Sequence, residues 1–130
     1  MARYEPIPPE TERLGKALLD VAFEVHTVLG AGFLERIYED AFCYELRLRR
    51  VPFERQKPIA VPYKDFQIEG QRLGLLIGGQ VIAGIKAVDE LHPIHQAQLM
   101  SYLKATGLRL GYLINFNVSH LKQGIRRIVL

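Results

Sequence analysis

A pair of adjacent glycines, Gly78-Gly79, separates two apolar runs and constrains the fold of this chain more than any other feature. The runs, residues 73–77 and 81–88, are rich in residues that favour β structure. Because glycine adopts the positive φ angles of a tight turn without steric cost, the stretch predicts a β-hairpin. A helix is predicted to follow over residues 93–106, with proline at its start and Gly107 after its end.

Three polar side chains in this stretch suggest a functional site. Lys86 lies inside the second apolar run, where burial of an ammonium group is costly unless the group has a partner or a function. Gln98 and Tyr102 are four residues apart on the predicted helix, so their side chains share one face. Simpler interpretations exist, because Lys86 can extend to the sheet edge and Tyr102 can pack in the core.

The first part of the chain predicts helices. Amphipathic helices are expected over residues 10–29 and 33–50, joined by Gly30-Ala31-Gly32 into a helical hairpin. Residues 1–9 are polar and rich in proline, and they are predicted to form a mobile arm. The second helix should bury one broad face, formed by Leu34, Ile37, Tyr38, Ala41, Tyr44, Glu45 and Leu48.

Pro52 marks the change to β structure. Turns are expected at Lys64-Asp65 and Glu69-Gly70. Because one predicted helix connects two strands, one strand pair can be parallel. The sequence therefore predicts one α/β domain over residues 10–130, with a mixed sheet flanked by helices. The expected strands cover residues 53–63, 66–68, 73–77, 81–88, 109–116 and 124–130.

Composition argues against several classes of protein. The 130 residues contain no apolar run of membrane-spanning length and no apolar core near the N-terminus, so a cytoplasmic protein without membrane partners is expected. Cys43 is the only cysteine, which excludes an intrachain disulfide and favours a buried structural thiol. The four histidines match no zinc spacing. The net charge of +3 permits nucleic-acid binding without establishing it.

A series of short motifs extends over most of the chain. Residues 32–38 read Gly-Phe-Leu-Glu-Arg-Ile-Tyr. Further motifs follow in order: Tyr44-Glu45-Leu46, Glu54-Arg55-Gln56, Ile85-Lys86-Ala87-Val88, His95-Gln96-Ala97-Gln98, Ser101-Tyr102-Leu103-Lys104 and Leu113-Ile114-Asn115-Phe116-Asn117. Together they resemble the GxxExxY proteins of bacteria and archaea, a family assigned to the PD-(D/E)XK nuclease superfamily.

The resemblance implies a restriction-endonuclease-like fold and Mg²⁺-dependent hydrolysis of phosphodiester bonds. In the superfamily, an Asp on one strand and an acid two residues before the lysine bind the metal. This sequence has Gly74 and Gly84 at those two positions. The catalytic-site residues that remain, by the same resemblance, are Lys86, Glu35, Gln98 and Tyr102.

Loss of both acids predicts that no metal is bound as the sequence stands, because Mg²⁺ requires carboxylate oxygens, and that catalysis is impaired. Binding of DNA or RNA is the leading expectation. Alternatives are an active Mg²⁺ nuclease with relocated ligands, and a catalytically dead protein-interaction module such as a homodimer. The glycines can also mark a bulge or close backbone packing. A basic rim for nucleic acid, or simply a solvated surface, is expected from Arg72, Lys104, Arg47 and Arg50.

Overall fold

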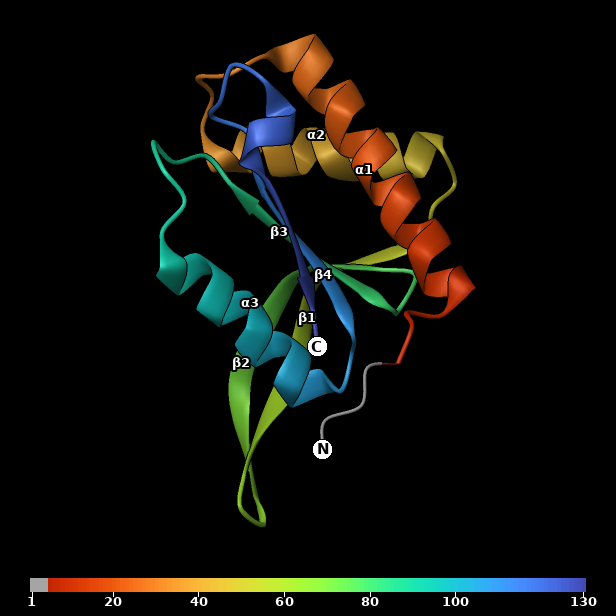
Figure 1. The fold of residues 1–130 in the computed structure, drawn as a ribbon, viewed down its shortest axis with the longest axis vertical. Coiled ribbons are helices and arrows are strands. Elements are labelled where there is room, and N and C mark those ends of the chain that lie inside the picture. Colours follow the sequence, from red (N-terminus) through yellow and green to blue (C-terminus); the bar gives the residue numbers. More distant parts are fainter. Residues whose placement is uncertain (1–4) are drawn as a thin grey trace.

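The computed structural model describes residues 5–130, whose helices and strands are shown in Figure 1. The helices are α1 (Pro9–Leu29), α2 (Glu35–Leu48) and α3 (Pro93–Thr106). The strands are β1 (Phe53–Tyr63), β2 (Phe66–Ile77), β3 (Val81–Lys86), β4 (Leu110–Asn115) and β5 (Ile125–Val129), with a short 3-10 helix at Leu121–Gly124. The predicted helix bounds agree with these to within about two residues.

The described strands form one mixed sheet in the order β1-β2-β3-β4-β5. β3 and β4, which α3 connects, run parallel, and the other neighbouring pairs are antiparallel. The predicted mixed sheet is therefore confirmed. The predicted turn at Glu69-Gly70 is wrong, because β2 continues through it. Gly70, with φ of 112°, lies instead where the β1–β2 register shifts, opposite the step from Ile59 to Val61.

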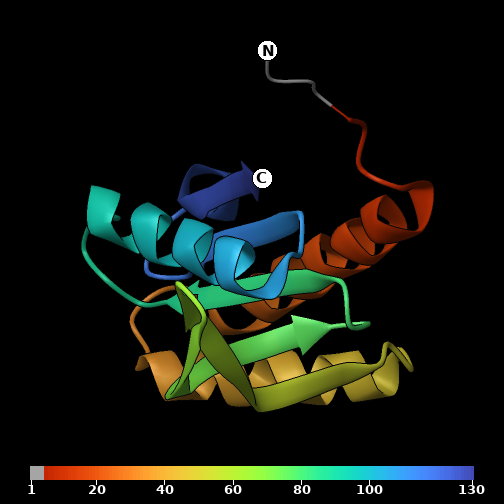
Figure 2. The same ribbon diagram turned by 90° about the horizontal axis from the view of Figure 1, so that it is seen from below.

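The sheet separates two apolar cores. α1 and α2 cover one face and α3 covers the other, as Figure 2 shows. On the first face, Leu18 and Phe42 pack against alternate residues of β3 and β4. On the second, Leu99 and Leu103 of α3 pack against the opposite set, including Ile82. This alternation follows from the two-residue period of a strand.

The connection between α1 and α2 is fixed by Tyr38. Gly30 and Gly32 within it have φ angles of 69° and 107°, which favour glycine. The Tyr38 hydroxyl donates to the Gly30 carbonyl oxygen at 2.6 Å and accepts from the Phe33 N–H at 3.2 Å. Its ring stacks on Phe116, with centroids 4.8 Å apart. The glycine and the tyrosine of residues 32–38 thereby determine where α2 begins.

The described part of the predicted N-terminal arm contacts the rest of the domain. Residues 1–4 of that arm lie outside the described residues. Ile7 is buried, and the Arg109 guanidinium donates hydrogen bonds to two backbone carbonyls of the segment. Residues 5–8 therefore pack against the domain, because the Ile7 side chain reaches its apolar core.

Two other expectations concern the single cysteine and membrane-spanning helices. Cys43 is fully buried, and burial raises the pKa of its thiol, as expected for a structural cysteine. No helix within residues 5–130 is long and apolar enough to cross a membrane.

Candidate functional site

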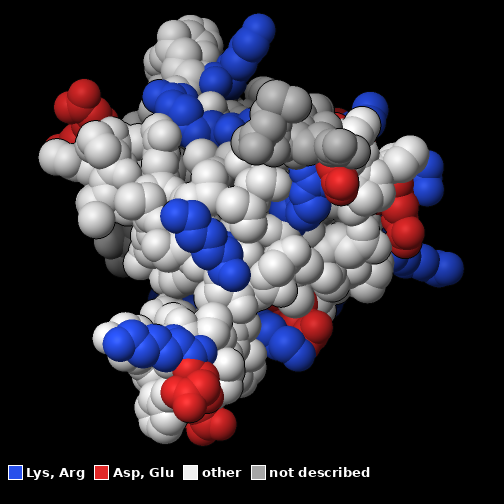
Figure 3. Space-filling model, turned by 60° about the horizontal axis from the view of Figure 1, so that its bottom comes forward, with Lys and Arg blue, Asp and Glu red and all other residues white. Residues whose placement is uncertain are grey.

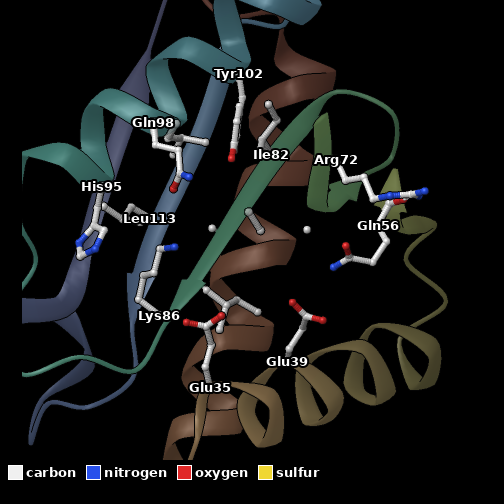
Figure 4. Close-up of a pocket in the computed structure, with 15 residues that line it drawn as sticks. Glu35, Glu39, Gln56, Arg72, Ile82, Lys86, His95, Gln98, Tyr102 and Leu113 are labelled. Carbon is white, nitrogen blue, oxygen red and sulfur yellow. Dashed lines mark hydrogen bonds between the residues drawn. The ribbon is translucent and has the colours of Figure 1, made fainter. Parts of the chain in front are cut away.

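The site forms where β2 and β3 separate. Their antiparallel ladder contains three pairs and ends at Leu75 and Ala83. The next residues along the two strands are Gly74 and Gly84, so the two predicted acid positions lie on adjacent strands at this fork. A cavity of about 230 Å³ opens here between the sheet, α2 and α3 (Figure 4). Its lining includes Glu35, Glu39, Gln56, Arg72, Gly74, Gly84, Lys86, His95, Gln98 and Tyr102.

Lys86 is the last residue of β3, and its ammonium group points into the cavity near the Gln98 side chain (Figure 4). Backbone contacts fix this strand end. The Phe116 N–H donates to the Lys86 carbonyl at 2.9 Å, and the Asn115 amide pairs with both backbone groups of Val88 at 3.0 and 2.9 Å. No ion pair within residues 5–130 involves Lys86. Its charge is therefore available to an anionic ligand.

Helix α3 forms one wall of the cavity. Gln98 and Tyr102 both line it, as their shared helix face predicts. The Gln71 side-chain amide donates to the Tyr102 hydroxyl at 3.1 Å, which ties the helix to β2. His95 was not predicted as a site residue but also lines the cavity. Its Nδ1 accepts the His92 N–H at 3.1 Å, so the same ring caps the helix. The three-residue spacing from His95 to Gln98 indicates that the two side chains share a helix face, and this could have identified His95 from the sequence.

Helix α2 contributes two carboxylates to the opposite wall. Glu35 and Glu39 lie one turn apart, and Figure 4 shows both pointing toward the sheet. Glu39 Oε2 accepts a hydrogen bond from Arg55 Nε at 2.9 Å and forms an ion pair with Arg55 Nη2 at 2.8 Å. The same guanidinium bonds Asp40, and this hydrogen bond lowers the pKa of the Asp40 carboxyl. Sequence reasoning missed Glu39, although its four-residue spacing from Glu35 indicates it.

Only part of the predicted basic rim reaches the cavity. Arg72 lines it and donates to the Gln56 backbone carbonyl at 3.3 Å. Arg47, Arg50 and Lys104 do not line it, and their part in nucleic-acid binding stays a prediction. The Arg47 guanidinium lies instead 5.4 Å from the centre of the Phe53 ring, a cation–π geometry that explains this arginine locally.

Neither glycine at the fork is required by space or by backbone conformation. A Cβ added at Gly74 would have Glu39 Oε1 as its nearest neighbour, at 3.8 Å. A Cβ at Gly84 would have Leu113 Cδ1, at 3.4 Å, which is ordinary contact. Neither residue has a positive φ angle. Close backbone packing is therefore the wrong explanation for these glycines.

Comparison with known families decides the relationship. The family model described as the PD-(D/E)XK nuclease superfamily matches residues 12–128. The chain belongs to this superfamily. The mixed sheet with helices on both faces agrees with the predicted restriction-endonuclease-like core. No curated protein and no solved structure matches the chain.

Members of the PD-(D/E)XK superfamily typically use Mg²⁺, and the residues of this cavity do not fit that ion. Mg²⁺ requires oxygen ligands in near-octahedral geometry, and the two strand positions at the fork carry no side-chain oxygen. Of the two carboxylates that remain, Glu39 is bound to Arg55. Within residues 5–130, no group of three or more His, Cys, Asp or Glu side chains is placed to hold a metal ion.

Proposed function

We propose that this PD-(D/E)XK domain binds nucleic acid without cleaving it. The observation that carries the proposal is the cavity at the β2–β3 fork, which brings together Lys86, Gln98 and Tyr102 and has glycine at positions 74 and 84, where the resemblance places two acids. An ammonium, an amide and a phenol are hydrogen-bond donors suited to phosphate oxygens. Hydrolysis additionally needs an activated water and neutralisation of the phosphate charge, which the superfamily's carboxylate-bound metal provides.

The charges around the cavity support this proposal. Lys86 and Arg72 bring positive charge, and the charge of Glu39 is offset by Arg55. Glu35 is the one other carboxylate of the lining. With two fewer acids at the fork than in an active member, the cavity repels a phosphodiester less.

The molecular surface offers no obvious alternative on the face shown in Figure 3. Lys and Arg side chains are scattered over that face, with neutral surface between them, and several lie next to acidic side chains. A continuous basic stripe is the usual electrostatic footprint of a protein that grips a duplex from outside. Binding centred on the cavity suits this distribution better.

The finer family assignment belongs to the same proposal. Residues 32–38 and the motifs that follow them support a GxxExxY protein. Nucleic-acid binding also suits the predicted cytoplasmic location, and it leaves open whether the nucleic acid is DNA or RNA.

A second candidate, an active nuclease with relocated ligands, is favoured by one observation. Glu39 Oε1 lies 3.8 Å from the position of a Cβ at Gly74, so its carboxylate is near the space that the missing strand acid would enter. Glu35 lies one helical turn away. The hydrogen bond and ion pair between Arg55 and Glu39 count against this candidate.

The test is a titration of labelled single- and double-stranded DNA and RNA at several salt concentrations. Lys86→Ala should weaken binding about tenfold or more, because hydrogen bonds to charged groups are the strong ones, and should reduce the salt slope by about one. Arg72→Ala should weaken binding as well. Lys16→Ala is the matched control, because this exposed lysine on α1 pairs only with Asp20 among residues 5–130.

The outcomes separate the candidates. No binding to any of the four nucleic acids at low salt would overturn the proposal and favour the protein-interaction module or homodimer. Mg²⁺- or Mn²⁺-dependent cleavage that disappears in Lys86→Ala and in Glu39→Gln would favour the relocated-ligand nuclease.

A further inference from the structure

The distal part of the β1–β2 hairpin, residues 59–71, is here termed the hairpin arm. Within β2, only residues 75–77 pair with β3. The two strands of the arm therefore pair only with each other within the described sheet. Figure 1 shows the arm projecting beyond α3. Residues 62–70 are all exposed. A ribbon of two strands gains little stability by itself, so its length is not explained by the core.

The tip of the hairpin arm exposes large apolar side chains. Tyr63 and Phe66 are directly paired across the turn and are 60% and 64% exposed, and Ile68 beside them is 45% exposed. Exposed apolar groups gathered at one place indicate contact with a partner. The Lys64 ammonium lies 5.4 Å from the centre of the Tyr63 ring. Aromatic faces combined with a cation are the features on which nucleic-acid bases stack.

The hairpin arm is continuous with the cavity. Arg72 lines both the cavity at the fork and a second hollow on the base of the arm, which Pro58, Ile59 and Gly70 also line. Gln71, in the same hollow, donates to the Tyr102 hydroxyl of the first cavity. The two hollows share Arg72, so a strand of nucleic acid bound at Lys86 can extend from the cavity onto the base of the arm.

The hairpin arm has a free edge on each strand, and the β1 edge is poorly suited to pairing with a second copy of the chain. β1 is the edge strand of the described sheet, and it carries Pro58 and Pro62. Neither proline has an N–H to donate, and proline on an edge strand blocks extension of the sheet.

We propose that the hairpin arm is a second nucleic-acid contact, in which Tyr63 and Phe66 stack on bases of the strand held at the cavity. This inference rests on the proposed function. Five residue steps separate Pro58, opposite Arg72, from Tyr63, a distance of about 17 Å. At about 3.4 Å per nucleotide of a stacked strand, this distance corresponds to roughly five nucleotides. Strands shorter than that reach the cavity or the arm tip, and longer strands reach both.

The test measures binding of single strands of about 3, 6, 9 and 12 nucleotides, a series that brackets the expected span. Affinity of the intact protein should rise about tenfold or more once the strand exceeds the span. In Tyr63→Ala/Phe66→Ala that rise should disappear, while binding of the shortest strand stays unchanged. Tyr63→Leu/Phe66→Leu should behave in the same way, because it keeps apolar area and removes the aromatic faces.

Tyr44→Ala is the matched control. Tyr44 is 61% exposed on α2 and does not line the cavity, so this variant should bind like the intact protein at every length. If the intact protein binds no strand, the proposed function fails. If it binds and both arm variants keep the full dependence on length, the proposed function stands and the arm inference is overturned. Analytical ultracentrifugation measures self-association of the same variants. If the arm variants lose self-association but keep their nucleic-acid affinity, the arm inference is overturned in favour of a homodimer contact.

Discussion

The β2–β3 hairpin contains two pairs of glycines that differ in what requires them. At the turn, Gly78 and Gly79 have φ angles of 58° and 71°, and a Cβ at Gly78 would lie 2.6 Å from Leu14 Cδ1. At the fork, Gly74 and Gly84 have no positive φ and leave room for a Cβ at 3.4 Å or more from its nearest neighbour. Backbone geometry explains the first pair and not the second.

This difference separates glycine that the backbone requires from glycine that the backbone does not require. The turn glycines set the path of the chain into β3 and thereby the place of Lys86. The fork glycines leave the two strand positions of the cavity without a side-chain oxygen. The β1–β2 ladder is irregular beside Gly74, where the positive φ angle, 55°, belongs to Gln56 on β1. The pairs on either side, Arg55 with Leu75 and Lys57 with Leu73, keep one register. The irregularity therefore does not require glycine at position 74.

Placing acids at the two fork positions tests the comparison most strongly. In Gly74→Asp/Gly84→Glu, both side chains should fit and should add carboxylate ligands for Mg²⁺. Calorimetry should detect Mg²⁺ binding, and cleavage should rise by at least about a thousandfold, since catalytic residues act as a unit. The triple variant with Lys86→Ala should bind Mg²⁺ and remain inactive. A folded double variant that binds no Mg²⁺ would contradict the assignment of the two positions.

The turn glycines should respond in stability instead. Gly78→Ala forces a side chain into the left-handed region and against Leu14, so the free energy of unfolding should fall by about 2–4 kcal/mol. Gly79→Ala separates the two causes, because no atom lies within 4 Å of its Cβ position. It should cost only the conformational strain, about 1–2 kcal/mol. Urea denaturation measures both, and equal stability of Gly78→Ala and the native protein would remove the structural explanation.

Much of the fold was predictable because its signals are local. The bounds of α3 and β1 match the prediction to the residue, since proline, glycine and Lys64-Asp65 mark them in the sequence. The inner face of α2 was predicted less well. Tyr44 and Leu48 are 61% and 60% exposed, because apolar residues surround much of that helix and only packing selects the buried side. The buried residues of α2 are Tyr38, Phe42, Cys43 and Leu46.

The site was predictable where a motif carries it. Residues from both strands of the fork and from α3 converge on one cavity, as the spacing of Lys86, Gln98 and Tyr102 implied. Gln56 stands in one of the motifs, but its place in the cavity was not predicted, because that place depends on how β1 lies beside the fork. The roles of these residues in binding remain predictions.

Two tyrosines extend the comparison from glycines to side chains. Tyr38→Phe keeps the ring on Phe116 but leaves the Gly30 carbonyl and the Phe33 N–H without their partner, so the free energy of unfolding should fall by about 1–3 kcal/mol. Tyr102→Phe loses one hydrogen bond, from Gln71, in a half-buried place, and should change stability by less than about 1 kcal/mol. It should weaken nucleic-acid binding instead. Urea denaturation and anisotropy titrations on both variants check this, and the opposite pattern would contradict it.

The smallest expected effect concerns the fork glycines without any added charge. In Gly74→Ala and Gly84→Ala, the new methyl group meets ordinary contacts at 3.8 and 3.4 Å, and alanine loses less conformational entropy than glycine within a strand. Each variant should therefore be more stable by about 0.5–1 kcal/mol. Since alanine carries no carboxylate, neither variant should bind Mg²⁺, which separates the effect of a side chain from the effect of a ligand. Urea denaturation measures the gain. A loss of more than about 1 kcal/mol in either variant would show that Leu113 or Glu39 does not accommodate the methyl group, and the distinction between the two pairs of glycines would not hold.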